Sequence, residues 1–214
     1  MAPYSPGTAS RPPSKPELAA IVMLAVFFGG MMLVALYEEY SVFKLSVPLF
    51  LVSWAILLFI HELGHALMAK WLGWRVEKIS IGTGKLISQF TILGMPTELR
   101  AIPLSGFVIP RPANLAFPRL KCFLIFGAGP GVEIGLALLI WLFLGSETLF
   151  SRQPIIWLIA LQSFGAAAVF GALVNLVPLN HQTDNGKSPS DGLGMILAWI
   201  IPEEQYEKWL NGQS

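Results

Sequence analysis

Thiols and charged side chains are scarce in this chain, and each shortage excludes a class of protein. The 214 residues include one cysteine, Cys122. A single thiol excludes an internal disulfide framework and is too little for a cysteine-based zinc site, so any metal must be held by histidine and carboxylate. Charged residues make up only 13% of the chain and the formal net charge is +1, which offers no argument for nucleic-acid binding.

Hydrophobic residues, in contrast, make up 54% of the chain, which is typical of a polytopic membrane protein rather than a soluble domain. Four apolar segments are long enough to span a bilayer: residues 18–37, 45–69, 122–144 and 154–179. A fifth apolar run, residues 192–202, is too short to span, and we expect a re-entrant or interfacial helix there.

Between the second and third segments, residues 74–110 do not follow a helical pattern. Apolar and polar residues alternate in parts of this stretch, and glycine and proline interrupt the runs. The pattern predicts short strands joined by turns. The expected fold is therefore an all-α polytopic membrane protein with about four transmembrane helices and a small membrane-associated β-sheet between the second and third.

The same pattern divides the chain into four parts. Residues 1–17, rich in proline and serine, are expected to form a disordered tail. Residues 18–44 hold the first transmembrane helix and its loop, residues 45–202 a transmembrane core that includes the strands, and residues 203–214 an amphipathic tail. Lysine and arginine gather in the loop after the second segment, so that loop and both termini are expected in the cytoplasm.

Residues 61–65 read His-Glu-Leu-Gly-His, an H-E-x-x-H pattern inside the second apolar segment. On a helix, His61 and His65 share one face and can bind one zinc ion. Glu62 can then reach an attacking water as general base, since zinc lowers the pKa of such a water to about 7. A chance match between two packed histidines is the alternative, and the high cost of ionisable residues within a membrane disfavours it.

Two histidines leave a catalytic zinc site incomplete, because such a site usually has three protein ligands. His181, Asp184 and Asp191 are the candidates for the third. All three follow the fourth apolar segment, which returns the chain to the side where the 61–65 motif lies.

Several stretches of the sequence resemble the site-2 protease family of intramembrane zinc metalloproteases. They are the 61–65 motif, residues 98–108, the Gly-Ala-Gly-Pro stretch of residues 127–130, and Asn-Leu-Val-Pro at 175–178 followed by an Asp-Gly pair. The resemblance covers roughly residues 45–197. It implies one zinc ion per chain, bound by His61, His65 and the aspartate of the Asp-Gly pair.

In this chain the Asp-Gly pair is Asp191-Gly192, and Asp184, one residue off that pattern, is the alternative ligand. Asp191 also suits the N-cap of the next apolar helix, whereas Asp184 is expected in a polar loop, residues 182–189. The matching segments also contain the candidates for contacting substrate, which are Gly106, Asn175 and Pro178.

The chain departs from the family pattern at three places. Ser105 stands where a second glycine is usual, Glu133 stands where asparagine is usual, and the linker between Pro178 and Asp191 is longer than the common form. Glu133 is costly if charged within the third apolar segment, so a functional role and a packing role are both open.

These observations predict an intramembrane zinc endopeptidase that acts in regulated intramembrane proteolysis, with Glu62 as its catalytic residue near the cytoplasmic side. The expected partners are a transmembrane protein substrate, the lipid bilayer and a regulatory membrane protein. One alternative is a non-catalytic membrane binder that retains the fold, against which the presence of Glu62 argues. Another is a metal-assisted membrane hydrolase that acts on a lipid or a prenylated peptide, which the motif alone does not exclude.

Overall fold

The computed structural model describes residues 41–183 and 186–211, together with residues 26, 29, 30, 33 and 37. The predicted tail and almost all of the predicted first transmembrane helix lie outside these residues. Their predicted structure, and with it the count of four spans, stays a prediction.

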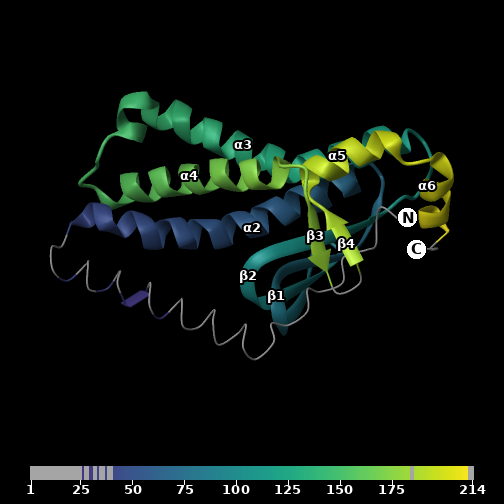
Figure 1. Ribbon diagram of the computed structural model, residues 1–214, viewed down its shortest axis with the longest axis horizontal. Helices are drawn as coiled ribbons and strands as arrows, with labels where there is room; N and C mark the ends of the chain where they lie inside the picture. Colours follow the sequence, from purple (N-terminus) through teal and green to yellow (C-terminus); the bar gives the residue numbers. More distant parts are fainter. Residues whose placement is uncertain are drawn as a thin grey trace.

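Three long apolar helices form the body of the described part (Figure 1). They are α2 (Ser46–Trp71), which follows the short 3-10 helix η1 (Val42–Leu45), α3 (Pro118–Phe150) and α4 (Ile156–Leu176). Each is long and apolar enough to cross a membrane. The helices predicted at 45–69, 122–144 and 154–179 are therefore confirmed, with bounds that differ by a few residues.

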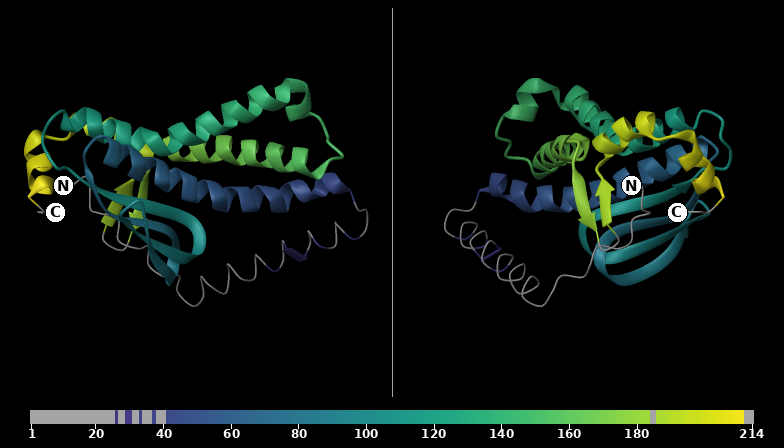
Figure 2. Two further views of the ribbon diagram at one scale, coloured as in Figure 1. Left: turned by 180° about the vertical axis from the view of Figure 1, so that it is seen from behind. Right: turned by 45° about the vertical axis from the view of Figure 1, so that its right-hand side comes forward.

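The three helices lie lengthwise beside one another in both views of Figure 2. Small residues allow close contact on their inner faces, where Leu57 of α2 packs against Ala167 and Ala168 of α4. Large apolar side chains such as Leu142 and Phe143 point outward instead and are more than two-thirds exposed. An apolar outer surface around closely packed helices is expected of a multi-pass membrane protein.

The predicted strands form one long hairpin of β1 (Arg75–Ile92) and β2 (Met95–Arg111). Leu93 and Gly94 join the strands, and both have positive φ, as a tight two-residue hairpin turn requires. The hairpin curls back on itself, so residues 79–81 pair with residues 106–108 on one side and with residues 97–99 on the other. The prediction of a small β-sheet is confirmed, while its placement against the membrane stays a prediction.

Apolar side chains on one face of the hairpin attach it to α2. Ile79, Ile81, Met95 and Val108 form a buried cluster with Ala66 of α2. On the hairpin, Glu98 forms ion pairs with Lys78 at 3.0 Å and with Arg100 at 2.7 Å. Burial alone would raise the pKa of Glu98, but the hydrogen bonds and charges of Arg100 and Lys78 outweigh it and lower the pKa.

After α4 the chain forms a second, small hairpin of β3 (Asn180–Thr183) and β4 (Gly186–Pro189). The prediction of a plain polar loop at 182–189 is wrong in this respect. These four-residue strands contain no large apolar side chain, so they lack the apolar alternation by which a sequence pattern detects a strand.

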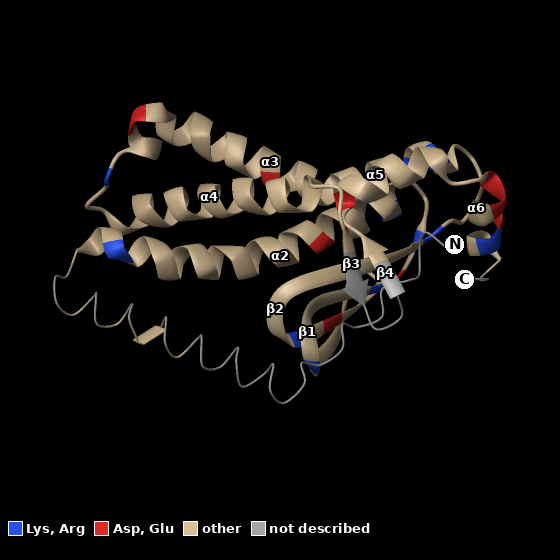
Figure 3. Ribbon diagram, in the orientation of Figure 1, with Lys and Arg blue, Asp and Glu red and all other residues tan. Residues whose placement is uncertain are grey.

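Two short helices complete the described chain, α5 (Asp191–Ile200) and α6 (Glu203–Leu210). Tyr206 and Trp209 of α6 are buried in a cluster with Trp74, Ile125 and Ala198. The Tyr206 hydroxyl donates to the Ala198 carbonyl at 3.0 Å, which fixes α6 to α5. Figure 3 shows charged residues gathered at the large hairpin, at α6 and at the helix ends, with few along α2, α3 and α4.

Candidate metal centre

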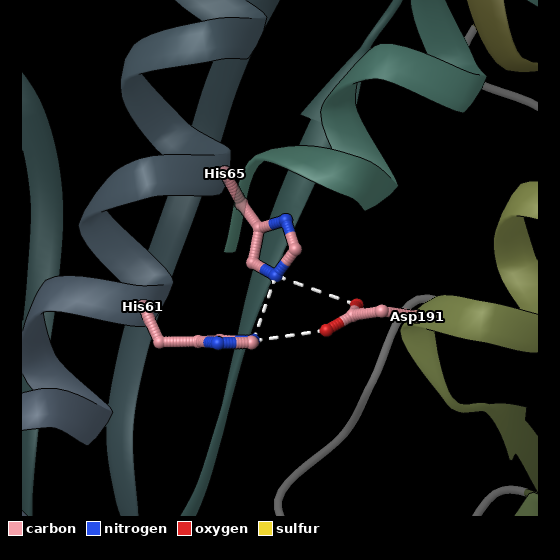
Figure 4. Close-up of side chains that lie close together, drawn as sticks. All are labelled: His61, His65 and Asp191. Atoms are coloured by element: carbon pink, nitrogen blue, oxygen red, sulfur yellow. Dashed lines mark hydrogen bonds and ion pairs between the residues drawn. The ribbon is translucent and has the colours of Figure 1, made fainter. Parts of the chain in front are cut away.

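Three polar side chains from two distant parts of the sequence meet where α5 begins beside α2 (Figure 4). His61 Nε2 lies 2.9 Å from Asp191 Oδ2, and His65 Nε2 lies 3.3 Å from Asp191 Oδ1. The two Nε2 atoms are 3.0 Å apart. The helical spacing of the motif therefore places both imidazoles on one face of α2, as predicted, and α5 brings a carboxylate to them.

The spacing of these donors fits a zinc ion. Zinc–nitrogen and zinc–oxygen bonds of about 2.0–2.1 Å at tetrahedral angles place neighbouring donor atoms roughly 3.3 Å apart. The separations of 2.9, 3.0 and 3.3 Å in the structure are close to that value. Two imidazoles and one carboxylate also leave a fourth position free, as a catalytic zinc site requires.

Glycine allows α3 to approach this cluster closely. A Cβ atom at Gly129 would lie 2.6 Å from His61 Nε2 and would also collide with His65 Nε2. Any side chain at this position would occupy the space into which both nitrogens point. Gly129 is therefore part of the candidate site, although the sequence marked it only as one residue of a resembling stretch.

Ser190, and not Asp191, caps helix α5, so the predicted N-cap at Asp191 is wrong. The Leu193 and Leu179 N–H groups donate to Ser190 Oγ at 3.4 and 3.0 Å, and the Ser190 hydroxyl donates to the Val177 carbonyl at 2.7 Å. Because the serine satisfies these backbone groups, the Asp191 carboxylate in the first turn stays available to the histidines.

Gly192 lets α5 begin against the end of α4. A Cβ atom at Gly192 would collide with the Leu176 carbonyl oxygen. This explains in physical terms why an aspartate of an Asp-Gly pair, rather than an isolated aspartate, reaches the histidines.

Glu62 lies next to the cluster and is 5% exposed. It contacts the backbone of β2 at Gly106, where a Cβ atom would lie 2.6 Å from Glu62 Cγ and 2.7 Å from Glu62 Oε1. Gly106, predicted as a substrate contact, therefore makes room for the Glu62 carboxyl group beside the strand.

Two other predicted site residues, Asn175 and Pro178, are not part of the cluster. Asn175 is half-buried near the end of α4, and its amide has no hydrogen-bond partner among the described residues. Pro178 is exposed in the segment between α4 and β3. His181 belongs to β3, while Asp184 lies outside the described residues.

The outer nitrogens of the two histidines have different partners. His65 Nδ1–H donates to the Ile125 carbonyl of α3 at 2.6 Å. His61 Nδ1 faces Glu133 Oε2, also of α3, at 3.1 Å. Glu133 had stood out in the sequence as a departure within an apolar segment, and the structure places it directly behind His61.

Comparison with known proteins gives consistent matches. The family described as Peptidase family M50 matches residues 49–192, which is more than half of the chain. "Putative zinc metalloprotease Cj1068" of Campylobacter jejuni is 33% identical over 113 residues, covering 46% of this chain and 30% of the relative. "Putative zinc metalloprotease RC0203" of Rickettsia conorii is 34% identical over 114 residues, covering 45% and 32%.

A shorter match has a higher percentage identity. A "Putative zinc metalloprotease" of Helicobacter pylori strain J99 is 46% identical over 54 residues, covering 25% of this chain and 15% of the relative. The chain thus spans about a third or less of the length of these three curated relatives.

Proposed function

The chain belongs to peptidase family M50, and on that basis we propose that it is an intramembrane zinc endopeptidase. In this proposal His61, His65 and Asp191 hold one zinc ion and Glu62 is the general base. The observation that carries the proposal is the meeting of three donor atoms from α2 and α5, all within 4.8 Å of one another, at the point where Glu62 is buried.

When bound, zinc would polarise the scissile carbonyl and lower the pKa of the attacking water. Glu62 would accept the proton of that water and pass it to the leaving amine. The close contact with Gly106 holds the Glu62 carboxyl group in place, and burial keeps bulk water away from it. Gly129 keeps the space in front of both imidazoles open to the metal.

The proposed substrate is a transmembrane segment of another protein. Cleavage requires its helix to unwind locally, and the freed backbone groups then need hydrogen-bond partners because lipid offers none. Gly106 and Phe107 of β2 pair with Ile81 and Ser80 on one side and pair with no further strand among the described residues. An extended peptide added there would run past Glu62.

Asn175 is the second proposed contact for substrate backbone. Its amide offers two donors and one acceptor, and the described residues leave it without a hydrogen-bond partner. Pro178 follows it where the chain leaves α4. Both residues belong to the proposed catalytic core, residues 45–202.

We also propose that the active site lies near the cytoplasmic side of the membrane and that both termini are cytoplasmic. In this proposal a regulatory membrane protein controls the access of substrate to the site.

Hydrolysis of a lipid or a prenylated peptide is the second candidate, since the same metal and base could perform it. The position of Gly106 on β2 beside Glu62 favours a peptide, because strand addition recognises the backbone of an extended chain. Mass spectrometry of the products separates the two reactions, since only proteolysis yields new peptide termini.

The direct test compares the wild-type protein with Glu62→Gln in detergent. The amide fills the same volume but does not accept a proton, so we expect zinc to be retained and cleavage of transmembrane peptides to fall by about 10²–10⁴-fold. Metal analysis and product mass spectrometry measure the two effects separately. Cleavage at the wild-type rate in Glu62→Gln would show that Glu62 is not the base.

A further inference from the structure

Glu133 is a buried carboxyl group that the proposed reaction does not use. It lies in the spanning helix α3 and is 3% exposed. Burying an ionisable side chain at such a position costs free energy unless the side chain interacts with a specific partner. The surroundings of Glu133 should therefore show what the side chain does.

The partner of Glu133 is the outer nitrogen of a proposed metal ligand. Glu133 Oε2 lies 3.1 Å from His61 Nδ1. Both atoms are buried, and neither has a hydrogen-bond partner elsewhere or meets the full geometry of a hydrogen bond with the other, so the 3.1 Å ion-pair contact is the one polar contact recorded for them among the described residues. The opposite nitrogen of the same ring faces Asp191 at 2.9 Å, so the His61 imidazole lies between two carboxyl groups.

A glycine on a third helix holds this carboxyl group in place. A Cβ atom at Gly171 of α4 would lie 2.6 Å from Glu133 Oε1 and 3.1 Å from Glu133 Cδ. The carboxyl group of α3 is thus confined between His61 of α2 and the backbone of α4. With so little space, Oε2 stays directed at His61.

We propose that Glu133 is a positioning residue of the metal centre and accepts a hydrogen bond from His61 Nδ1–H. This bond fixes the tautomer whose Nε2 lone pair points at the metal, and it fixes the orientation of the ring. The inference rests on the proposed zinc site. It also gives the two histidines unlike support, because His65 Nδ1–H donates to the neutral Ile125 carbonyl instead.

A carboxyl partner makes an imidazole a better electron donor than a carbonyl partner does, and loss of such an outer partner typically weakens metal binding by about 10–100-fold. The contribution of His61 to zinc affinity should accordingly depend on Glu133. A purely structural role for Glu133, as a contact between α2 and α3, predicts no such effect on the metal.

The test measures the zinc dissociation constant of the full chain in detergent by competition with a chelator. Glu133→Leu keeps much of the volume and removes the acceptor, so we expect zinc to bind about 10–100-fold more weakly. Glu133→Gln keeps an acceptor oxygen at the same place and should recover part of that loss. Gly135→Ala, on the same helix with open space around the new methyl group, is the control and should bind like wild type.

The order of the two Glu133 variants decides the matter. Weaker zinc binding in Glu133→Leu than in Glu133→Gln supports the hydrogen bond, whereas equal affinities in the two variants would overturn it. If Glu133→Leu does not fold, Gly171→Ala replaces it, since the added methyl group would displace the carboxyl group from another helix. Affinity equal to that of Gly135→Ala would then overturn the proposal.

Zinc affinity can be measured independently of the proposed proteolytic activity. It needs only the metal, so the order of affinities can be read even if no substrate is cleaved. Conversely, a protein that binds no zinc in its wild-type form would contradict the proposed function before Glu133 is tested.

Discussion

The two ends of the helical core are packed in different ways. The site end consists of residues 61–71, 118–133 and 171–176 with α5, and the far end consists of residues 46–60, 134–150 and 156–170. At the site end, glycines bring backbone directly against ionisable side chains, as Gly129 does with the histidines and Gly171 with Glu133. At the far end, Gly135 and Gly145 have nothing within 4 Å of the position of a Cβ atom, and Gly165 meets only the apolar side chain of Ile140.

Apolar contacts dominate the far end instead. The rings of Phe50, Trp54 and Phe170 lie within 6.4 Å of one another there, and Leu57 packs on Ala167. The contrast shows that, of the two ends, the site end is where glycine backbone lies directly against ionisable side chains. A small added side chain should therefore disturb metal binding at the site end and leave it unchanged at the far end.

The largest effect that follows from this contrast is expected for Gly129→Ala. The new methyl group would occupy the space in front of both Nε2 atoms, so zinc affinity should fall by more than the roughly 100-fold typical of changes outside the ligand shell. Chelator competition measures it, with Gly135→Ala at the far end of the same helix as the control, because a Cβ atom there meets nothing within 4 Å. Equal affinities for the two variants would remove the contrast between the ends.

A smaller effect is expected from a matched pair of serines, one at each end. Ser190→Ala removes the cap of α5 and two further bonds, which should cost about 1–2 kcal/mol of stability and also weaken zinc binding, because Asp191 follows directly. Ser163→Ala removes a single bond, to the Ser46 carbonyl at 3.1 Å, and should lower stability alone. Thermal unfolding with and without zinc measures both. Weaker zinc binding in Ser163→Ala would contradict the separation.

The smallest effect is expected from single cysteine substitutions, which test on which side of the membrane each end lies. Lys85 is exposed on the large hairpin and Ser146 is exposed near the far end of α3. Cysteines introduced singly at these positions should react with a membrane-impermeant reagent from opposite sides of the bilayer, with Lys85→Cys on the cytoplasmic side. Cys122 is buried and should contribute little background. Labelling of both positions from one side would contradict the proposed orientation.

The parts of the site that follow a helical period could be predicted from the sequence. His61, Glu62 and His65 needed only the spacing of one turn, and the long apolar runs marked the helices around them. Asp191 required a resemblance, because nothing local in the sequence shows that α5 returns to α2. The pairing of Gly129 and Gly171 with side chains of other helices is a tertiary contact, which no pattern within one segment encodes.

Two predictions on the α4–α5 connection failed for a related reason. The cap of α5 is Ser190 because its hydroxyl reaches both Leu193 and the backbone after α4, a contact that bridges two elements. The β3–β4 hairpin forms from polar residues, so its pairing follows from the two helices that fix its ends and not from an apolar pattern. Sequence reasoning was most successful within single elements and least successful where two elements meet.

The most direct test of the central claim compares two aspartates at the α4–α5 connection. Zinc content of the purified protein would be measured for Asp191→Ala and for Asp184→Ala. Asp191 Oδ2 is 2.9 Å from His61 Nε2, so its removal should release the metal and abolish cleavage, while Asp184→Ala should retain about one zinc ion per chain, as an intact three-ligand site does. Loss of zinc from Asp184→Ala together with full zinc content in Asp191→Ala would contradict the proposed metal centre.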